Sequence, residues 1–196
     1  MIGTQTLEEK NSKYNGKLKV VRTWGMGTYI QAGGLTQSGG IVESIWKSTI
    51  KRIKKEEIKT CLVLGLGGGT VAKIIQKNWS GVKITGVDID LTIVELGKKY
   101  LGLENVQIKI KDAYSFDTKG YDLVIVDVYR GDNFPEKFED EKFLKKLSKN
   151  KLVIFNRLYY GDKRPMAVKF GLKIQKIFKK VEYFYPEANL MFICSF

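Results

Sequence analysis

The sequence predicts an α/β fold built on one doubly wound, mostly parallel sheet. From Thr60 onward, apolar strand-like runs alternate with segments of helical period, an order that requires crossover helices and a sheet covered on both faces. The first of these runs, at 61–66, leads directly into a glycine-rich turn and a helix. The chain ends in two strand-like runs separated only by residues 186–189, too few for a crossover helix. We therefore expect the last strand to run antiparallel beside its neighbour, or to lie at an edge.

The N-terminal part of the chain has a different pattern. Residues 17–31 predict two short strands around a turn at Gly25 and Gly27, because β-branched and aromatic residues flank these glycines. Residues 41–55 predict an amphipathic helix. Its apolar stripe consists of Ile41, Ile45, Trp46, Ile50 and Ile53. We divide the chain into an N-terminal hairpin and helix, 1–56, and a Rossmann-like ligand-binding domain, 57–196.

The remaining elements follow in regular alternation. Strands are expected at 61–66, 83–88, 106–112, 121–128 and 151–156, and helices near 69–78, 90–101, 136–149 and 164–179. The two terminal runs lie within 181–196. Five parallel strands followed by a reversed terminal hairpin form the layout of the class I methyltransferase fold.

Composition limits the chemistry that the protein can perform. The 196 residues include no histidine, so the commonest general base and metal ligand is absent, and we expect no metal site. Cys61 and Cys194 lie in strand-like runs and are expected to be core residues. No apolar run could span a bilayer, and the first residues do not resemble a secretory signal, so we expect a cytoplasmic protein without a membrane partner. The net charge of +13 permits nucleic-acid binding, although the lysines are scattered, as on a solvated surface.

Glycines and acids follow the predicted strands where a ligand site would lie. Glycines at a strand end let backbone N–H groups and a helix N-terminus approach a ligand closely. Asp88 ends the second strand about twenty residues further on, where a carboxylate can accept both hydroxyls of a ribose. Asp112 ends the third strand within reach of an adenine amino group, and Asp127 ends the fourth. Because the carboxyl ends of parallel strands meet at one edge, we expect a shared crevice, with Asp127 as a proton acceptor or cation anchor.

These motifs resemble those of the spermidine synthase-like (polyamine aminopropyltransferase) branch of class I S-adenosylmethionine-dependent methyltransferase-fold proteins. The resemblance is carried by "GLTQSGG", "VLGLGGGT", "VDID", "KDAYSF", "VDVYRGD" and "YPEANLMFICS". It implies a cytoplasmic transferase that binds S-adenosylmethionine or its decarboxylated form. The implied cofactor-binding residues are Gln37, Gly65, Gly67, Gly68, Gly69, Asp88, Ile89, Asp112 and Ala113. Related enzymes also form dimers, so a homodimer is an expectation.

The resemblance assigns Asp127 the task of deprotonating and orienting the attacking amine. Two positions depart from the family pattern: Thr70 stands where the family commonly has an aspartate for the aminopropyl ammonium, and Arg130 stands where it commonly has a second strand-four aspartate. A cation at this place would oppose binding of a diamine's second ammonium. The residues that we expect to shape the acceptor pocket are Glu43, Tyr129 and Asp132.

The expected reaction is in-line displacement at a carbon next to a sulfonium, which moves an aminopropyl or methyl group to a nucleophile, with a small-molecule amine as the expected acceptor. Three alternatives stay open. The protein could methylate RNA or a different small molecule, because its charge suits a polyanion. It could be a non-catalytic nucleoside-binding module, given Thr70 and Arg130. It could be a nicotinamide-dependent oxidoreductase, because residues 67–72 also satisfy a relaxed dinucleotide fingerprint.

Overall fold

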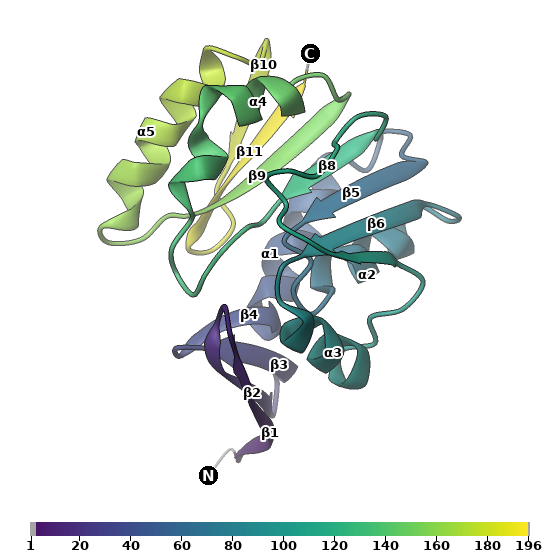
Figure 1. Ribbon diagram of the computed structural model, residues 1–196, viewed down its shortest axis with the longest axis vertical. Coiled ribbons are helices and arrows are strands. Elements are labelled where there is room, and N and C mark those ends of the chain that lie inside the picture. Colours follow the sequence, from purple (N-terminus) through teal and green to yellow (C-terminus); the bar gives the residue numbers. More distant parts are fainter. Residues whose placement is uncertain (1–2, 196) are drawn as a thin grey trace.

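The computed structural model describes residues 3–195 and contains two sheets, a four-stranded one near the N-terminus and a seven-stranded one after it (Figure 1). Residues 1–2, at the start of the predicted N-terminal part, and residue 196, at the end of the predicted ligand-binding domain, lie outside the described residues. One helix connects the two sheets. The division of the chain near residue 56 stays a prediction.

The four-stranded sheet is antiparallel throughout. Its strands, in spatial and chain order, are β1 (Thr4–Ser12), β2 (Gly16–Thr23), β3 (Gly27–Ala32) and β4 (Leu35–Gly39). The predicted hairpin of 17–31 corresponds to β2 and β3, whereas β1 and β4 were not predicted. Most of β1 is exposed, so its sequence carries no alternation of apolar and polar residues. The N-terminal element is therefore a sheet rather than a lone hairpin.

The predicted amphipathic helix is α1 (Gly40–Arg52), which follows β4 without a loop. Ile45, Trp46 and Ile50 are buried, as their helical spacing predicts. Ile41 differs from this pattern, because it is 40% exposed. None of the helices formed by residues 3–195 is both long enough and apolar enough to cross a bilayer.

The seven-stranded sheet has the strand order β10-β11-β9-β8-β5-β6-β7. Its strands and helices are β5 (Thr60–Leu64), α2 (Thr70–Asn78), β6 (Lys83–Asp88), α3 (Leu91–Tyr100), β7 (Gln107–Ile110), β8 (Leu123–Val126), η1 (Glu136–Glu139), α4 (Glu141–Leu147), β9 (Leu152–Leu158), α5 (Lys163–Gln175), β10 (Lys180–Phe184) and β11 (Asn189–Ser195). Pairing is parallel from β9 to β7, and β11 runs antiparallel between β9 and β10. The last strand therefore lies beside its neighbour inside the sheet, not at an edge, and the predicted α/β fold is confirmed.

One predicted helix is wrong in detail. The segment 136–149 forms a short 3-10 helix, η1, and a separate α-helix, α4, with a break at Asp140. The carboxylate of Asp140 accepts a hydrogen bond from the backbone N–H of Phe143 at 2.7 Å and so caps α4. An aspartate with extended backbone angles at this place starts a new helix, because its side chain satisfies a free N–H of the first turn.

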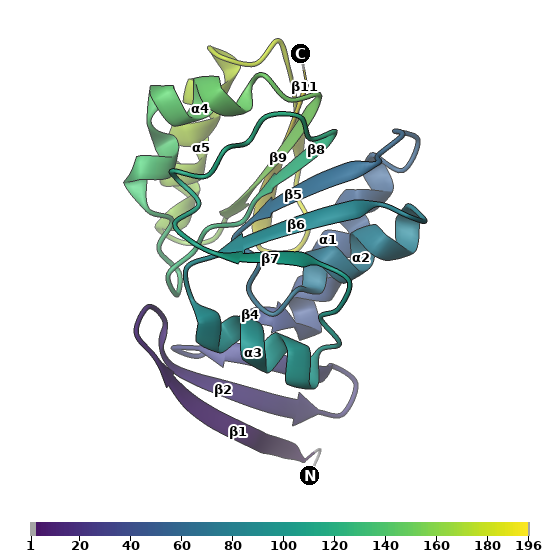
Figure 2. The same cartoon turned by 45° about the vertical axis from the view of Figure 1, so that its right-hand side comes forward.

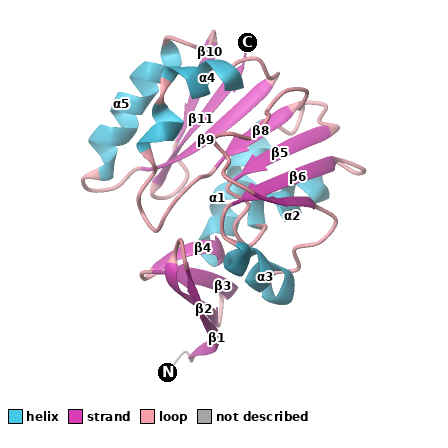
Figure 3. Ribbon diagram, in the orientation of Figure 1, coloured by secondary structure: helices cyan, strands magenta, loops and turns pink. Residues whose placement is uncertain are grey.

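Helices cover both faces of the large sheet (Figure 3), and alternate strand residues point to opposite faces. Val63 belongs to the apolar cluster shared with α1, α2 and α3, whereas Leu64 belongs to the cluster shared with α4 and α5. The first cluster also includes Leu18 and Ile30 of the small sheet. Figure 2 shows α3 between the small sheet and the edge strand β7. The two sheets are thus held together by one continuous apolar core.

Candidate functional site

A cleft of about 370 Å³ lies between the two sheets. Its walls include residues that follow β5, β6, β8 and β9, together with the residues just before β11. Because β11 runs antiparallel, its start lies at the same edge as the carboxyl ends of the parallel strands. The opposite wall comes from the turn between β1 and β2, from β4 and from the first half of α1. The cleft therefore occupies the place where open α/β sheets bind their ligands.

The glycine turn between β5 and α2 forms the floor of the cleft at Gly65 and Gly67. Gly65 has a φ of 85°, and a Cβ atom there would overlap the backbone carbonyl of Asp127. Gly67 has a φ of 53° and donates its backbone N–H to the carboxylate of Asp88 at 2.7 Å. The absence of side chains thus lets the turn pass close to both acids that follow the neighbouring strands.

Gly68 and Gly69, unlike Gly65 and Gly67, do not line the cleft. The backbone N–H of Gly68 donates to the hydroxyl of Ser38 at 2.8 Å, which joins the turn to β4. Gly69 has a φ of 86°, and a Cβ atom there would lie 2.5 Å from a methyl carbon of Leu103. These two glycines allow close packing and the start of α2 rather than contact with a ligand in the cleft.

Asp88 is oriented by two backbone donors. Its carboxylate accepts hydrogen bonds from the N–H of Gly67 at 2.7 Å and of Asp90 at 2.9 Å. Burial raises the pKa of Asp88 to about 6, although both backbone donors act in the opposite direction. Ile89 also lines the cleft. Asp90 is the N-cap of α3 and accepts from the N–H of Thr92 at 3.0 Å, which leaves Asp88 free to face the cleft.

Asp112 and Ala113 line the cleft next to the edge strand β7. The carboxylate of Asp112 forms an ion pair with Lys137, which also lines the cleft. Partial burial opposes ionisation, but Lys137 and the N–H of Tyr114 together lower the pKa of Asp112 below its usual value. The charge of Arg130 contributes to this lowering as well. Asp112 therefore presents an ionised acceptor to the cleft.

Asp127 is held by two donors from different elements. One carboxylate oxygen accepts from the indole N–H of Trp46 at 3.2 Å, and the other accepts from the amide of Asn156 at 2.8 Å. Burial is the largest influence and raises the pKa of Asp127 to about 6, and the charge of Asp88 acts in the same direction. Both donors lower the pKa, but less than burial raises it. Asp127 is thus a partly desolvated acid whose orientation is fixed by Trp46 and Asn156.

Of the three residues expected to shape an acceptor pocket, one lines the cleft. Tyr129 lies in its wall, where its hydroxyl accepts from the N–H of Leu158 at 2.8 Å and burial raises its pKa. Glu43 is outside the wall and pairs with Lys47, one helical turn further along α1, at 2.8 Å. Asp132 is also outside the wall and pairs with Lys163 at 2.8 Å. The side chains of Glu43 and Asp132 are therefore bound elsewhere.

Both positions that depart from the family pattern have partners within the chain. The hydroxyl of Thr70 accepts the backbone N–H of Gly39 at 2.7 Å, which ties β4 to the start of α2. The guanidinium of Arg130 lies over the ring of Tyr14, 5.8 Å from its centre. Arg130 also lines the cleft.

Gln37 lines the cleft, and its amide donates to the carbonyl of Gly131 at 3.4 Å, so it connects β4 to the loop after β8. Asn15 was not predicted. It lies in the turn between β1 and β2, donates to the carboxylate of Asp90 at 2.7 Å and lines the cleft. The side-chain oxygen of Asn15 is buried without a hydrogen-bond partner among the described residues. A ligand with a hydroxyl or amino group would satisfy this oxygen.

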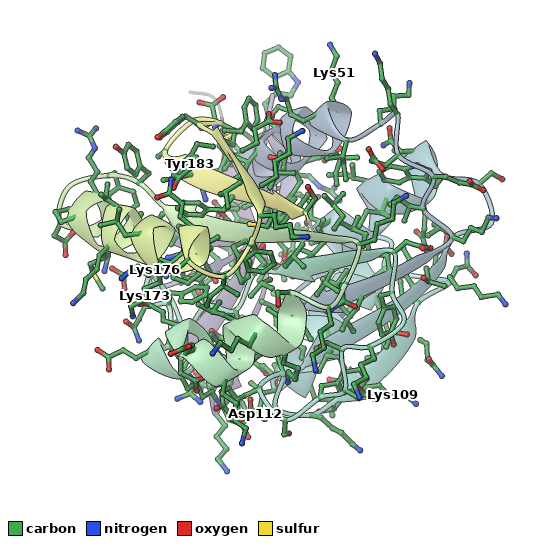
Figure 4. All side chains as sticks on the ribbon, turned by 90° about the horizontal axis from the view of Figure 1, so that it is seen from above. Lys51, Lys109, Asp112, Lys173, Lys176 and Tyr183 are labelled. Atoms are coloured by element: carbon green, nitrogen blue, oxygen red, sulfur yellow. The ribbon has the colours of Figure 1, made fainter. Side chains whose placement is uncertain are left out.

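The positive charge does not concentrate at the cleft. Figure 4 shows Lys51 and Lys109 far apart and Lys173 and Lys176 beside each other on a third part of the molecule, with Asp112 labelled at the lower side of the view. Several other lysines pair with acids on the surface, such as Lys59 with Glu57 at 2.9 Å. The charge pattern thus resembles a solvated lysine-rich surface more than a continuous basic groove.

Comparison with known proteins places this architecture among S-adenosylmethionine-type folds. No family model matches the chain. A curated relative is the "eEF1A lysine and N-terminal methyltransferase" of Mus musculus, 26% identical over 156 residues, which are 69% of this chain and 22% of that protein. The match therefore spans about a fifth of the relative's length.

Solved structures match far more of the chain. A probable spermidine synthase from Corynebacterium glutamicum superposes with a TM-score of 0.77 at 20% identity, covering 100% of this chain and 80% of that one. A spermidine synthase in complex with the transition-state analogue AdoDATO has a TM-score of 0.73 at 15% identity, covering 97% and 72%. Human methyltransferase-like protein 13 in complex with SAH has a TM-score of 0.60 at 18% identity, covering 79% and 81%. The chain thus has the class I methyltransferase fold in the form found in spermidine synthases.

Proposed function

We propose that the protein is a transferase that binds S-adenosylmethionine or its decarboxylated form and moves an alkyl group from the sulfonium to an amine. The observation that carries this proposal is a single cleft in which Gly67 and Asp88 stand on one side and Asp127, held by Trp46 and Asn156, on the other. The relatives of similar fold, spermidine synthases and methyltransferases, support a transferase of this kind.

The residues of the cleft fit an adenosine-containing ligand. The turn at Gly65 and Gly67 leaves bare backbone where a Cβ atom would collide with its surroundings. Asp88 keeps unused lone pairs for ribose hydroxyls, because the N–H groups of Gly67 and Asp90 each occupy only one of them. The unpartnered oxygen of Asn15 offers a further acceptor. Asp88 and Asn15 would hold the sugar, and Asp112 and Ala113 the base.

When bound, the sulfonium supplies an activated carbon and a leaving group that departs without acid assistance. The task of this chain's own residues is then to align the amine and take its proton. A carboxylate whose pKa burial raises to about 6 accepts a proton more readily than an ordinary aspartate, and Asp127 is such a group. The apolar side chains of Val42, Ile45 and Leu158 line the cleft and limit the access of water.

The experiment is calorimetric titration of the protein with S-adenosylmethionine, its decarboxylated form, methylthioadenosine and NAD. We expect binding of at least one sulfur-bearing adenosine compound, none of NAD, and loss of most affinity in Asp88→Asn. Loss of two hydrogen bonds to a charged acceptor, at about 1.5 to 3 kcal/mol each, corresponds to a roughly hundredfold to ten-thousandfold weaker affinity. Asp132→Asn is the matched control, because this acid lies outside the cleft wall. Binding of NAD alone would support the oxidoreductase alternative instead.

Methyl transfer to an amine of a protein is a second candidate. It is favoured by the similarity to a relative whose name states lysine and N-terminal methylation. Thr70 leaves the first turn of α2 without an acidic side chain. Because a helix N-terminus attracts anions, this favours S-adenosylmethionine, which keeps its carboxylate, over the decarboxylated form. Product analysis with S-adenosylmethionine and a lysine-containing peptide, against 1,4-diaminobutane, distinguishes the two candidates. RNA methylation predicts a steep salt dependence of RNA binding.

A further inference from the structure

We propose that Asn156, locked by Asn189, and Trp46 are positioning residues for the proposed reaction: in the wall of the cleft they donate to the two oxygens of Asp127 and fix its orientation, so that its remaining lone pairs are left as acceptors. This inference rests on the proposed function, because it concerns the acid that would receive the amine proton. It adds three residues, from β9, β11 and α1, to which the sequence assigned no role at the site.

The orientation of the Asn156 amide is determined by Asn189. The Nδ2 of Asn189 donates to the Oδ1 of Asn156 at 2.7 Å, and the Nδ2 of Asn156 donates to Asp127 at 2.8 Å. A flipped Asn156 would place its oxygen against the carboxylate and its N–H groups against those of Asn189, two unfavourable contacts at hydrogen-bond distance. Both asparagines are only 6% exposed, so water does not offer alternative partners. Asn156 therefore always donates to Asp127.

Trp46 supplies the second fixed donor. Trp46 is a residue of α1 that is 0% exposed, and its indole N–H lies 3.2 Å from the other carboxylate oxygen of Asp127. An indole has one donor and no acceptor. The packed ring cannot turn away without disturbing the apolar core that both sheets share. Trp46 and Asn156 together hold the carboxylate plane in one orientation.

Two donors without acceptor capacity favour the ionised carboxylate. If Asp127 were protonated, neither neighbour could accept its hydrogen, which would have to find an acceptor in the cleft. The charge that opposes ionisation comes from Asp88, on β6, and Tyr129, in the same segment as Asp127, is neutral because burial raises its pKa. The network thus keeps a desolvated acid charged and directed toward the cleft, as an acceptor of an amine proton requires.

The experiment follows the titration of Asp127 directly, without a substrate. Protein labelled with ¹³C at aspartate carboxyls is titrated by NMR, and the resonance of Asp127 is identified by its loss in Asp127→Asn. We expect Trp46→Phe to raise the midpoint of Asp127 by about one unit, the effect of losing one hydrogen bond to a charged group. Asn189→Leu should raise it by less, because Asn156 keeps its N–H groups but loses the partner that fixes their direction. Asn189 does not contact Asp127, so the effect of Asn189→Leu tests whether Asn189 fixes the orientation of the Asn156 amide.

Matched variants separate this role from general destabilisation. Trp79 donates its indole N–H to the carbonyl of Glu56 at 2.8 Å, and Asn150 is a buried asparagine that donates to the carbonyl of Leu147 at 2.9 Å. Trp79→Phe and Asn150→Leu are expected to leave the midpoint of Asp127 unchanged. If Asn189→Leu unfolds, the double variant Asn156→Leu/Asn189→Leu removes both polar partners together and should raise the midpoint at least as much. A midpoint that stays at the wild-type value in Trp46→Phe and in either asparagine variant overturns the inference.

A second readout distinguishes this inference from the proposed function. With S-adenosylmethionine or its decarboxylated form as donor and 1,4-diaminobutane or butylamine as acceptor, Trp46→Phe should lower kcat about fivefold near pH 6 and leave it unchanged near pH 8.5. A purely structural defect would lower kcat at both pH values. Absence of transfer to every acceptor would contradict the proposed function, whereas the NMR titration would still decide the role of Asn156, Asn189 and Trp46.

Discussion

Replacing Asp127 by asparagine should change how the stability of the protein depends on pH. Burial raises the pKa of Asp127 from 3.8 to about 6 in the folded protein. A group whose pKa is higher in the folded state stabilises that state fully below the unfolded pKa. This stabilisation is lost as the pH rises through the folded pKa. Asp127 therefore stabilises the protein in acid relative to neutral solution, opposite to an acid in a surface ion pair.

The size of the effect follows from the two pKa values. A rise from 3.8 to about 6 is about 2.2 units, or about 3 kcal/mol between the acidic and alkaline limits. Between about pH 8 and about pH 5 only part of this range is crossed, and the expected gain is about 1.4 kcal/mol. Asp88 contributes in the same direction in both proteins, because burial raises its pKa to about 6 as well.

Urea unfolding of the wild type and of Asp127→Asn at about pH 8 and about pH 5 measures the difference. The wild type should gain about 1.4 kcal/mol more than the variant on acidification. Asp132→Asn is the control, because the Lys163 ion pair lowers the pKa of Asp132 below 3.8, outside this pH window. Equal pH dependence of the wild type and Asp127→Asn would refute the reasoning, since it would mean that the carboxylate is not desolvated.

Three further predictions concern the glycine turn, the joint between the sheets and the nucleoside site. Gly69→Ala should lower the free energy of unfolding by about 2 to 4 kcal/mol, because of its positive φ and its contact with Leu103, whereas Gly16→Ala, with open space around it, should cost about 1 kcal/mol in thermal unfolding. Asp90→Ala should remove the cap of α3 and its contacts with the β1–β2 turn, which urea unfolding would record as a loss of about 2 to 3 kcal/mol. Methylthioadenosine affinity should fall about tenfold per pH unit well below pH 6 in calorimetry, where Asp88 becomes protonated, and the Asp88→Asn variant should lose this dependence.

Several site residues could be predicted because they follow strands in the sequence. Asp88 and Asp127 each come at the end of an apolar strand, and parallel strands bring their carboxyl ends to one edge. The glycine turn after β5 is visible as a break in apolar sequence, and two of its four predicted positions line the cleft. Local patterns thus predict which backbone segments reach the site.

Other features depend on tertiary contacts that no local pattern records. Trp46 and Asn156 come from α1 and β9, and only the folded chain brings them to Asp127. The sequence predicts Trp46 as a core residue of an amphipathic helix, and Trp46 is buried. Its indole N–H also donates to Asp127, which the sequence does not indicate. In the sequence, Asn15 indicates only a turn. Its place in the cleft depends on the packing of the small sheet against α3, where Asn15 donates to Asp90.

Glu43 and Asp132 were expected to shape the acceptor pocket, but neither lines the cleft. Closeness in sequence to a site does not determine where a side chain points. Glu43 lies on the face of α1 that carries Lys47, while the apolar stripe faces the core. Asp132 lies two residues beyond Arg130 but turns to Lys163 at the start of α5. A lysine partner for each acid could not be identified without the fold, since the chain has many lysines.

The most direct test is a crystal structure of the protein grown with S-adenosylhomocysteine. The account predicts the nucleoside in the cleft between the two sheets, with its ribose hydroxyls on the carboxylate of Asp88 and its sulfur on the side of Asp127. A well-diffracting complex with the compound bound elsewhere, or with the cleft filled by the protein's own side chains, would contradict the account.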